Sequence, residues 1–391
     1  MNQRDISEIR RRLNPDKRNP TLIRGCYVRP DGQVISTFVQ PVGAMPQEEN
    51  EKYMALFKRV LSGTAGQNLL QVDFSTEQVM HGEEYATLAE LRASALTDEE
   101  SVAALYQRAI AYIQSLNEQQ AQSVEAQQNA SNYLILLMHD GYDVPYKDIN
   151  GENDRERSTD LFNYIMCCVC PVKQAKSALR YFAAESTFHA SESDWVVGAP
   201  ELGFLFPCFE ERSANINCAM YYTRSSGDMH DVFIQSVFNT GVIMPADEQK
   251  ETFQYILQET LAEECSLDVV QAVHETVTEL IQQQKADKNA EPLVFTKNDV
   301  KTMLQDCGVS EEHTAAFEEK YDESFGAQAA LPAVNMVTPK QFRLDTPNVS
   351  IRVKPDFSDL VETRVIDGRR YICIKADDGD VEVNGIKLSG W

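Results

Sequence analysis

Three cysteines stand close together in one apolar run, Cys167, Cys168 and Cys170 in the segment YIMCCVC. Alternation along a β-strand would place Cys168 and Cys170 on one face and Cys167 on the other. Two thiols on one face are candidate metal ligands, with His139 as a further candidate. Structural zinc sites, however, usually combine two CxxC pairs on turns, and the sequence offers no second such pair. Small, buried, apolar thiols are therefore the favoured interpretation.

A second polar group follows the apolar run LILLM, namely His139, Asp140 and, three residues later, Asp143. A histidine beside carboxylates can serve as a general base or a metal ligand, and strand ends often carry such sites. With Cys170 in the same sheet, a Cys–His nucleophilic pair is a further hypothesis, which requires His139 and Cys170 to share one face. The simpler interpretation is that Asp140 and Gly141 begin a turn in which His139 hydrogen-bonds locally.

The rest of the sequence carries none of the signatures that recognisable chemistry demands, whether a Ser-His-Asp elbow, a dinucleotide fingerprint, HExxH or a kinase set. No cofactor is implied. The leading hypothesis is therefore a non-enzymatic interaction or adaptor protein with a protein partner. Its contacts would be made by exposed edges of a terminal sheet or by an apolar groove beside a helical hairpin. An enzyme that uses His139, Asp140, Asp143 and Cys170 is the alternative.

Charge limits the partners that we expect. The chain has 60 acidic and 36 basic residues and a formal charge of −24, which would repel DNA. One basic cluster occupies the first two dozen residues and comprises Arg4, Arg10, Arg11, Arg12, Lys17, Arg18 and Arg24. RNA or ribosome contact would require Arg4, Arg11, Lys17 and Arg24 to form one exposed patch. The simpler interpretation is a solvated face of the first helix.

The sequence also predicts a cellular compartment. No stretch approaches 18 consecutive apolar residues, and the amino terminus shows no apolar segment after its charges. The nine cysteines lie mostly in apolar runs, which suits reduced, buried thiols. We therefore expect a cytoplasmic protein that makes no membrane contact.

Length and patterning predict a multi-part α+β fold. With 391 residues, 43% of them apolar, the chain should form several cores. We expect an α+β region over residues 1–130, a β-rich region with a central sheet over 131–245, and a helical region over 246–326 that begins with a hairpin. Residues 327–339 resemble a linker, and 338–391 predict a small β-module in which Asp367-Gly368 and Asn384-Gly385 supply two-residue turns.

Several longer strings carry a resemblance to a known family. They are RGCYV at 24–28, LILLMHDGYDVP at 134–145, CPV at 170–172, DWVVGAPELGFLFPCF at 194–209 and LVETRVIDG at 360–368. Together they resemble a bacterial family catalogued as domain of unknown function 4317, from end to end of the chain. The resemblance implies no activity, so it assigns no catalytic residue.

Overall fold

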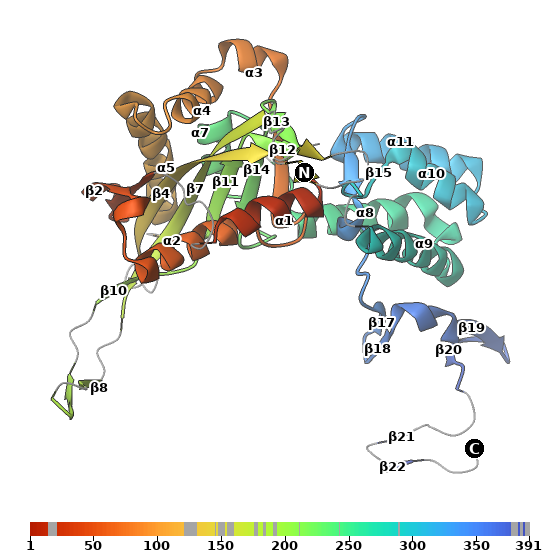
Figure 1. Ribbon diagram of the computed structural model, residues 1–391. Coiled ribbons are helices and arrows are strands. Elements are labelled where there is room, and N and C mark those ends of the chain that lie inside the picture. Colours follow the sequence, from red (N-terminus) through yellow and green to blue (C-terminus); the bar gives the residue numbers. More distant parts are fainter. Residues whose placement is uncertain are drawn as a thin grey trace. The chain divides into compact units, whose positions relative to one another are not determined.

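The computed structural model describes most of the chain. The described residues are 1–14, 22–120, 131–144, 146–147, 153–154, 160–175, 179–182, 185–190, 194–210, 212–241, 243–287, 290–376, 382–383 and 386–387. They fall into two compact units, Met1–Pro245 and Ala246–Trp391. The fold class is α+β, with one large antiparallel sheet in the first unit and small two-stranded sheets besides (Figure 1).

The first unit combines a sheet with helices on both of its faces. Its helices are α1 (Gln3–Arg12), η1 (Val42–Ala44), α2 (Gln47–Val60), α3 (Thr76–His81), α4 (Glu83–Ala93), α5 (Glu99–Gln120) and α7 (Asp231–Phe238). Its strands are β1 (Leu22–Val28), β2 (Val34–Pro41), β3 (Leu69–Asp73), β4 (Asn132–Val144), β5 (Tyr146–Lys147), β6 (Asn153–Asp154), β7 (Asp160–Gln174), β8 (Leu179–Phe182), β9 (Thr187–Ala190), β10 (Trp195–Val197), β11 (Leu202–Phe206), β12 (Cys208–Glu210), β13 (Ser213–Asn215) and β14 (Cys218–Thr223).

The large sheet has the strand order β2-β1-β4-β7-β11-β14-β3, with β10 paired to β7. Along the central strands of the sheet, alternate residues belong to two separate cores. One core packs under α4, α5 and α7 and includes Ile135 and Leu137 of β4, and the other packs under α1 and α2 and includes Leu136 and Met138 (Figure 1). We call these the α5 face and the α1 face. Because helices cover both faces, the strands read as unbroken apolar runs.

The boundary that we expected near residue 130 does not separate compact units. Strand β1 pairs with β4 along its whole length, from Leu22 opposite His139 to Val28 opposite Tyr133. Strand β3 pairs with β14 at the other end of the sheet. Residues on both sides of position 130 therefore build one sheet and share its two cores.

The second unit begins at Ala246, where the helical region was expected. Its elements are α8 (Ala246–Leu261), η2 (Ala262–Glu264), α9 (Leu267–Ala286), β15 (Val294–Thr296), α10 (Lys297–Asp306), α11 (Glu311–Phe325), β16 (Ala330–Pro332), η3 (Ala333–Asn335), β17 (Phe342–Thr346), β18 (Val349–Val353), η4 (Pro355–Leu360), β19 (Val361–Ile366), β20 (Arg369–Ile374), β21 (Glu382–Val383) and β22 (Ile386–Lys387).

The segment that resembled a linker is part of this unit's core. Leu331, Ala333, Met336 and Val337 are buried beside apolar side chains of α8 to α11. Strand β16 pairs with β15. The linker expectation was wrong because small residues and prolines here allow close packing rather than flexibility.

The terminal hairpins are attached to this core through α9. The Gln271 side chain donates hydrogen bonds of 2.6 and 3.0 Å to the carbonyls of Ser358 and Val361, at the start of β19. Asp367 and Gly368 have φ values of 52° and 73°, the left-handed conformations that a two-residue hairpin turn needs. The turn predicted at Asn384-Gly385 lies outside the described residues, between the paired strands β21 and β22.

Candidate functional site

The structure does not assemble the site predicted around His139. Strand β4 continues past it to Val144, so His139 and Asp140 are neighbours on one strand and point to opposite faces. His139 lies on the α5 face, and Asp140 lies on the α1 face with Tyr164. Cys170 shares the face of Asp140 but is aligned with Leu134. That register puts it five residues, about 17 Å, along the sheet from His139. The Cys–His pair is therefore excluded.

His139 and Asp143 each lie in their own environment. His139 is 9% exposed, and burial, followed by the positive charge of Arg92, lowers the pKa of its imidazole. Its Nδ1 has no hydrogen-bond partner among the described residues. Asp143 is exposed near the end of β4. An uncharged, buried histidine without a neighbouring nucleophile is a packing residue rather than a general base.

Asp140 belongs to a polar network that ties α1 to the sheet. Tyr164 donates a 2.8 Å hydrogen bond to Asp140 Oδ2, and Arg12 Nε lies 3.6 Å from the same oxygen. The Arg12 guanidinium also stacks 4.2 Å from the centre of the Tyr142 ring. Burial raises the pKa of the Asp140 carboxyl, while Arg12 and Tyr164 oppose that shift. Every charge here has a protein partner, which indicates a structural role.

The cysteines of β7 are also structural. Cys168 and Cys170 share a face, as alternation predicted, with their sulfurs 3.8 Å apart and fully buried. Burial raises the pKa of Cys168. Neither thiol belongs to a group of three metal-ligating side chains in the described part of the chain. Cys168 and Cys170 therefore have no third metal ligand among the described residues, and His139 does not supply one.

The exposed basic patch that RNA or ribosome contact would require cannot include Arg24. Arg24 in β1 is 7% exposed and makes two hydrogen bonds, of 2.9 and 2.6 Å, to Glu99 of α5. It therefore lies on the α5 face, whereas Arg4 and Arg11 are exposed on α1, which covers the other face. Lys17 lies outside the described residues. Arg24 is engaged in the fold and does not join a nucleic-acid surface.

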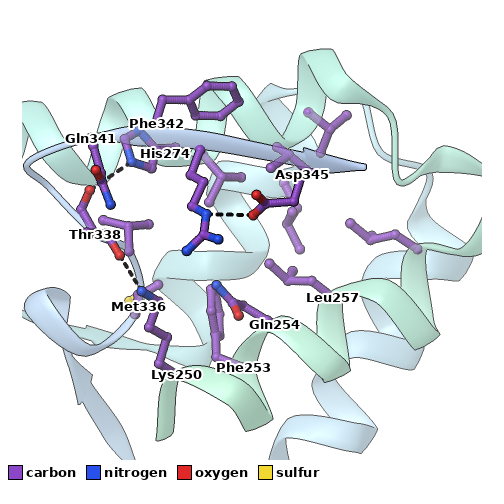
Figure 2. Close-up of a pocket in the computed structure, with 17 residues that line it drawn as sticks. Lys250, Phe253, Gln254, Leu257, His274, Met336, Thr338, Gln341, Phe342 and Asp345 are labelled. Atoms are coloured by element: carbon purple, nitrogen blue, oxygen red, sulfur yellow. Dashed lines mark hydrogen bonds and ion pairs between the residues drawn. The ribbon is translucent and has the colours of Figure 1, made fainter. Parts of the chain in front are cut away.

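The second unit contains a cavity of about 400 Å³ beside the α8–α9 hairpin (Figure 2). Its floor is apolar and comprises Phe253, Leu257, Leu261, Val269, Val273, Leu304, Met336, Val337 and Phe342. The α8 residues recur at helical spacing, which turns one stripe of that helix toward the cavity. Helices α8 and α9 supply one side, and the segment that leads into β17 supplies the other.

The polar side chains of this cavity lie at its rim. Lys250 donates a hydrogen bond to the Thr338 hydroxyl, and Arg343 Nε lies 2.6 Å from Asp345 Oδ2 (Figure 2). Lys250 has no carboxylate within ion-pair distance among the described residues. Two cations face one carboxylate, so the rim carries excess positive charge in an otherwise acidic chain.

His274 adds one further polar group to the cavity wall. Its Nε2 lies 3.1 Å from the carbonyl oxygen of Thr338, which can only accept, so Nε2 carries the hydrogen. Its Nδ1 has no hydrogen-bond partner among the described residues. The side chain is 9% exposed. The cavity wall therefore includes one largely buried polar side chain.

The comparison with known families covers almost the whole chain. The family described as domain of unknown function, DUF4317, matches residues 1–386. The chain belongs to this family. No curated protein and no solved structure matches the DUF4317 chain. Among its described residues, no helix has both the length and the apolar character needed to cross a membrane.

Sequence reasoning located the cavity of this DUF4317 protein only in part. The helical spacing of residues 247–285 indicated the hairpin and an apolar groove beside it. It did not single out Lys250, His274 or Arg343. Arg343 is far from the hairpin in sequence, and no local signal shows that β17 returns to α8 and α9. The excess of positive charge at the rim becomes visible only in three dimensions.

Proposed function

We propose that the protein is a non-enzymatic interaction protein and that its second unit binds a segment of a partner protein beside the α8–α9 hairpin. The observation that carries the proposal is the cavity with an apolar floor and a cationic rim. Grooves of this kind accept apolar anchors that project at helical spacing from a partner's segment. This unit would then serve as the binding module of the protein.

The chemistry of the rim defines the occupant. An apolar floor of this size accepts one or two large side chains, and ligand cavities commonly begin at about 300 Å³. The Lys250 ammonium, beside the Arg343–Asp345 ion pair, complements a carboxylate. The occupant that fits both parts is a short peptide segment with a large apolar anchor next to an acidic side chain. Elsewhere the chain's net charge of −24 would repel such a segment, so the rim would direct it to this cavity.

A second surface in the same unit supports an interaction role. On the hairpin β19–β20, register places the buried Val361 together with Thr363, Val365, Arg370, Ile372 and Ile374 on one face. Val365, Ile372 and Ile374 are 70%, 41% and 55% exposed. A two-stranded hairpin with an exposed apolar face gains stability when another surface covers it. This face would extend the contact made at the cavity.

Selection from a display library of random 12-residue peptides tests the proposal with the full-length protein. We expect the selected peptides to combine a large apolar residue with a neighbouring Asp or Glu. Fluorescence anisotropy should then show at least tenfold weaker binding to Lys250→Glu, which corresponds to about 1.4 kcal/mol. Lys285→Glu makes the same charge change on an exposed residue of α9 outside the cavity lining and should bind as the wild type does.

Three results would overturn the proposal. The first is a selection that yields no binding peptide. The second is a set of peptides whose affinity is equally insensitive to Lys250→Glu and to Leu257→Asp, which places a charge on the apolar floor. The third is binding of decanoate, a small apolar carboxylate, with no binding of any peptide, which would make the cavity a small-molecule site.

A further inference from the structure

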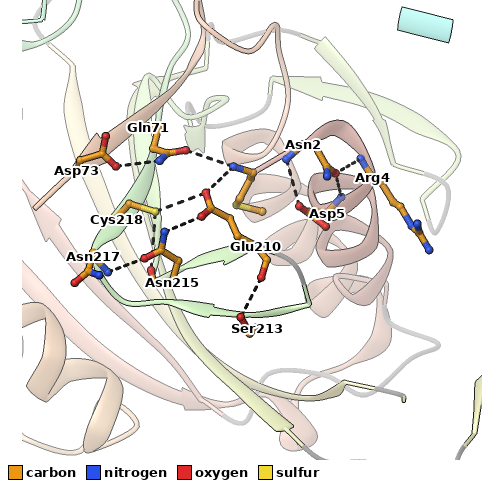
Figure 3. Close-up of polar contacts among 11 residues, drawn as sticks. Asn2, Arg4, Asp5, Gln71, Asp73, Glu210, Ser213, Asn215, Asn217 and Cys218 are labelled. Carbon is orange, nitrogen blue, oxygen red and sulfur yellow. Dashed lines mark hydrogen bonds and ion pairs between the residues drawn. The ribbon is translucent and has the colours of Figure 1, made fainter. Parts of the chain in front are cut away.

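We infer that Cys208, Glu210 and Cys218 in the first unit form a binding site for a zinc ion. The two sulfurs and a carboxylate oxygen of Glu210 all lie within 4.8 Å of one another. Figure 3 shows the Glu210 carboxylate directed toward Cys218. In the described part of the chain, no other group of three such side chains converges in this way. The site is independent of the peptide cavity, which lies in the second unit.

The fold brings these three donors together through a short hairpin. Strand β12 carries Cys208 and Glu210 two residues apart, so both side chains project from the same face of the strand. Strand β13 returns with Asn215 opposite Cys208, and the chain then enters β14 at Cys218. Both cysteines are fully buried on the α1 face, and Glu210 is partly buried. The three donors are therefore held on paired strands rather than on loose loops.

Their chemistry fits zinc. Zinc binds thiolate sulfur at about 2.3 Å and carboxylate oxygen at about 2.0 to 2.2 Å, so tetrahedral ligands lie about 3.5 to 3.8 Å apart. The distance from Cys218 Sγ to Glu210 Oε1 is 3.9 Å, close to that edge. Three protein ligands leave the fourth position to water or another small ligand, as in zinc sites that are not purely structural.

Neighbouring groups already orient the carboxylate. Asn215 Nδ2 donates a 2.7 Å hydrogen bond to Glu210 Oε2, and the Asn217 amide donates one of 3.0 Å to Asn215 Oδ1 (Figure 3). This chain of bonds fixes Oε2 and turns Oε1 toward the sulfurs, the kind of support that orients metal ligands. Cys168 and Cys170 differ from this site, because their sulfurs lie 3.8 Å apart but no carboxylate joins them in a group of three candidate ligands among the described residues.

A positive group already lies against this carboxylate. The amino nitrogen of Met1 is 2.9 Å from Glu210 Oε1. Burial alone would raise the pKa of Glu210, but the hydrogen bond from Asn215 and the amino group lower it, so the carboxylate is ionised. The pocket therefore accommodates a cation at Oε1, and a zinc ion would replace this contact.

Binding balances without any redox step. Zinc binds the thiolate form of cysteine, so binding to neutral thiols releases protons. Zinc would displace one proton from each thiol to solvent and form two Zn–S bonds and one Zn–O bond. Affinity should consequently fall as the pH is lowered.

Metal analysis of the full-length protein, expressed and purified without chelators, tests the inference. We expect about one equivalent of zinc by mass spectrometry, and a thiolate-to-metal charge-transfer band after replacement by Co²⁺. Cys208→Ser should lose both signals. Glu210→Gln, which keeps both thiols and a side chain of the same shape, should weaken zinc affinity by tenfold or more.

The double variant Cys168→Ala/Cys170→Ala is the matched control, because it removes two buried thiols from the same face of the sheet without touching the proposed ligands. It should retain one equivalent of zinc. Circular dichroism identifies variants that fail to fold. If Cys208→Ser fails to fold, Glu210→Gln still tests the inference. The inference is wrong if folded wild-type protein takes up neither zinc nor Co²⁺ from dialysis at neutral pH, or if Glu210→Gln binds zinc as tightly as the wild type.

Discussion

The hydrogen bond from Tyr164 to Asp140 offers a measurable test of how the first unit is held together. Tyr164 is fully buried, Asp140 is 4% exposed, and their oxygens are 2.8 Å apart. A hydrogen bond to a charged group contributes about 1.5 to 3 kcal/mol, and the loss of one partner leaves a buried oxygen unsatisfied. Tyr164→Phe removes only the hydroxyl. We expect it to lower the free energy of unfolding by about 2 kcal/mol at pH 7.

The cost should depend on pH in a defined direction. Burial raises the pKa of folded Asp140 above its unfolded value of about 3.9, so folding takes up a proton between these two values. The contribution of Asp140 to stability is therefore full below the unfolded pKa and declines as the pH rises through the folded pKa. The Tyr164 hydroxyl stabilises the ionised form of Asp140. Removing it therefore raises the folded pKa of Asp140 further, and stability declines over a wider range of pH. At pH 4, where more of the folded Asp140 carboxyl is protonated than at pH 7, we expect a smaller cost of about 1 kcal/mol, because a hydrogen bond between neutral groups contributes less than one to a charged group.

Hydrogen exchange of the β4 and β7 amides measures this locally, because those strands are central in the sheet. Tyr255→Phe is the control. Tyr255 lies on α8 of the second unit and is 58% exposed, so its hydroxyl should be dispensable. A cost below about 0.5 kcal/mol for Tyr164→Phe at pH 7 would show that the hydroxyl does not stabilise the carboxylate. An equal cost at pH 4 and pH 7 would refute the charge argument.

Two further predictions concern packing in the sheet and the exposure of the cysteines. In Gly203→Ala, the new methyl group would lie 2.4 Å from the carbonyl oxygen of Cys167 and 2.8 Å from Val60, so we expect a loss of about 3 kcal/mol in thermal or urea unfolding. Gly241→Ala, whose added carbon meets nothing within 4 Å, should change stability by less than about 0.5 kcal/mol, and equal effects of the two variants would contradict the packing described. In brief labelling of native protein with iodoacetamide, mass spectrometry should find Cys265, Cys307 and Cys373, which are partly exposed, modified before Cys167, Cys168 and Cys170. Preferential modification of Cys170 would revive a nucleophilic role.

Local patterns predicted most elements but not their exact ends. The first helix illustrates this, because Asp5 and Glu8 have the spacing of a capping box that would open at Asp5. The structure instead caps α1 with Asn2, and Asp5 occupies the third helical position and completes the box. The motif is the same, but it begins one turn earlier. In helix α9, by contrast, the residue type and the observed cap agree, because Ser266 precedes Leu267 and its side chain accepts a hydrogen bond from the Val269 amide.

The site predicted around His139 is not formed, because strand β4 extends beyond the apolar run LILLM. We expected a turn after Met138, since Asp140 and Gly141 favour one. In the structure β4 continues, because Tyr164 and Arg12 give the Asp140 carboxylate buried partners. Those partners come from β7 and α1, so no local signal identifies them. Once the strand continues, alternation alone separates His139 from Asp140.

The candidate sites that the structure does contain depend on contacts between distant parts of the chain. Cys208 and Cys218 are separated by a hairpin whose register the sequence does not specify. Lys250 in α8 and Arg343 in β17 are far apart in sequence and line the same cavity only in the folded unit. The sequence shows which cysteines and charged residues are present, but it does not show which of them lie together in the fold.

The pairing of β3 with β14 has a consequence for biosynthesis. Leu69 lies opposite Tyr222, so the edge strand waits for about 150 further residues before its partner leaves the ribosome. At about 5 to 20 residues per second, that delay lasts from several to about thirty seconds. During it, the apolar side chains Leu69 and Val72 lack the β14 neighbours that later flank them. Nascent chains of this protein should therefore depend on holding chaperones until residue 223 has emerged, and truncations that end before it should aggregate.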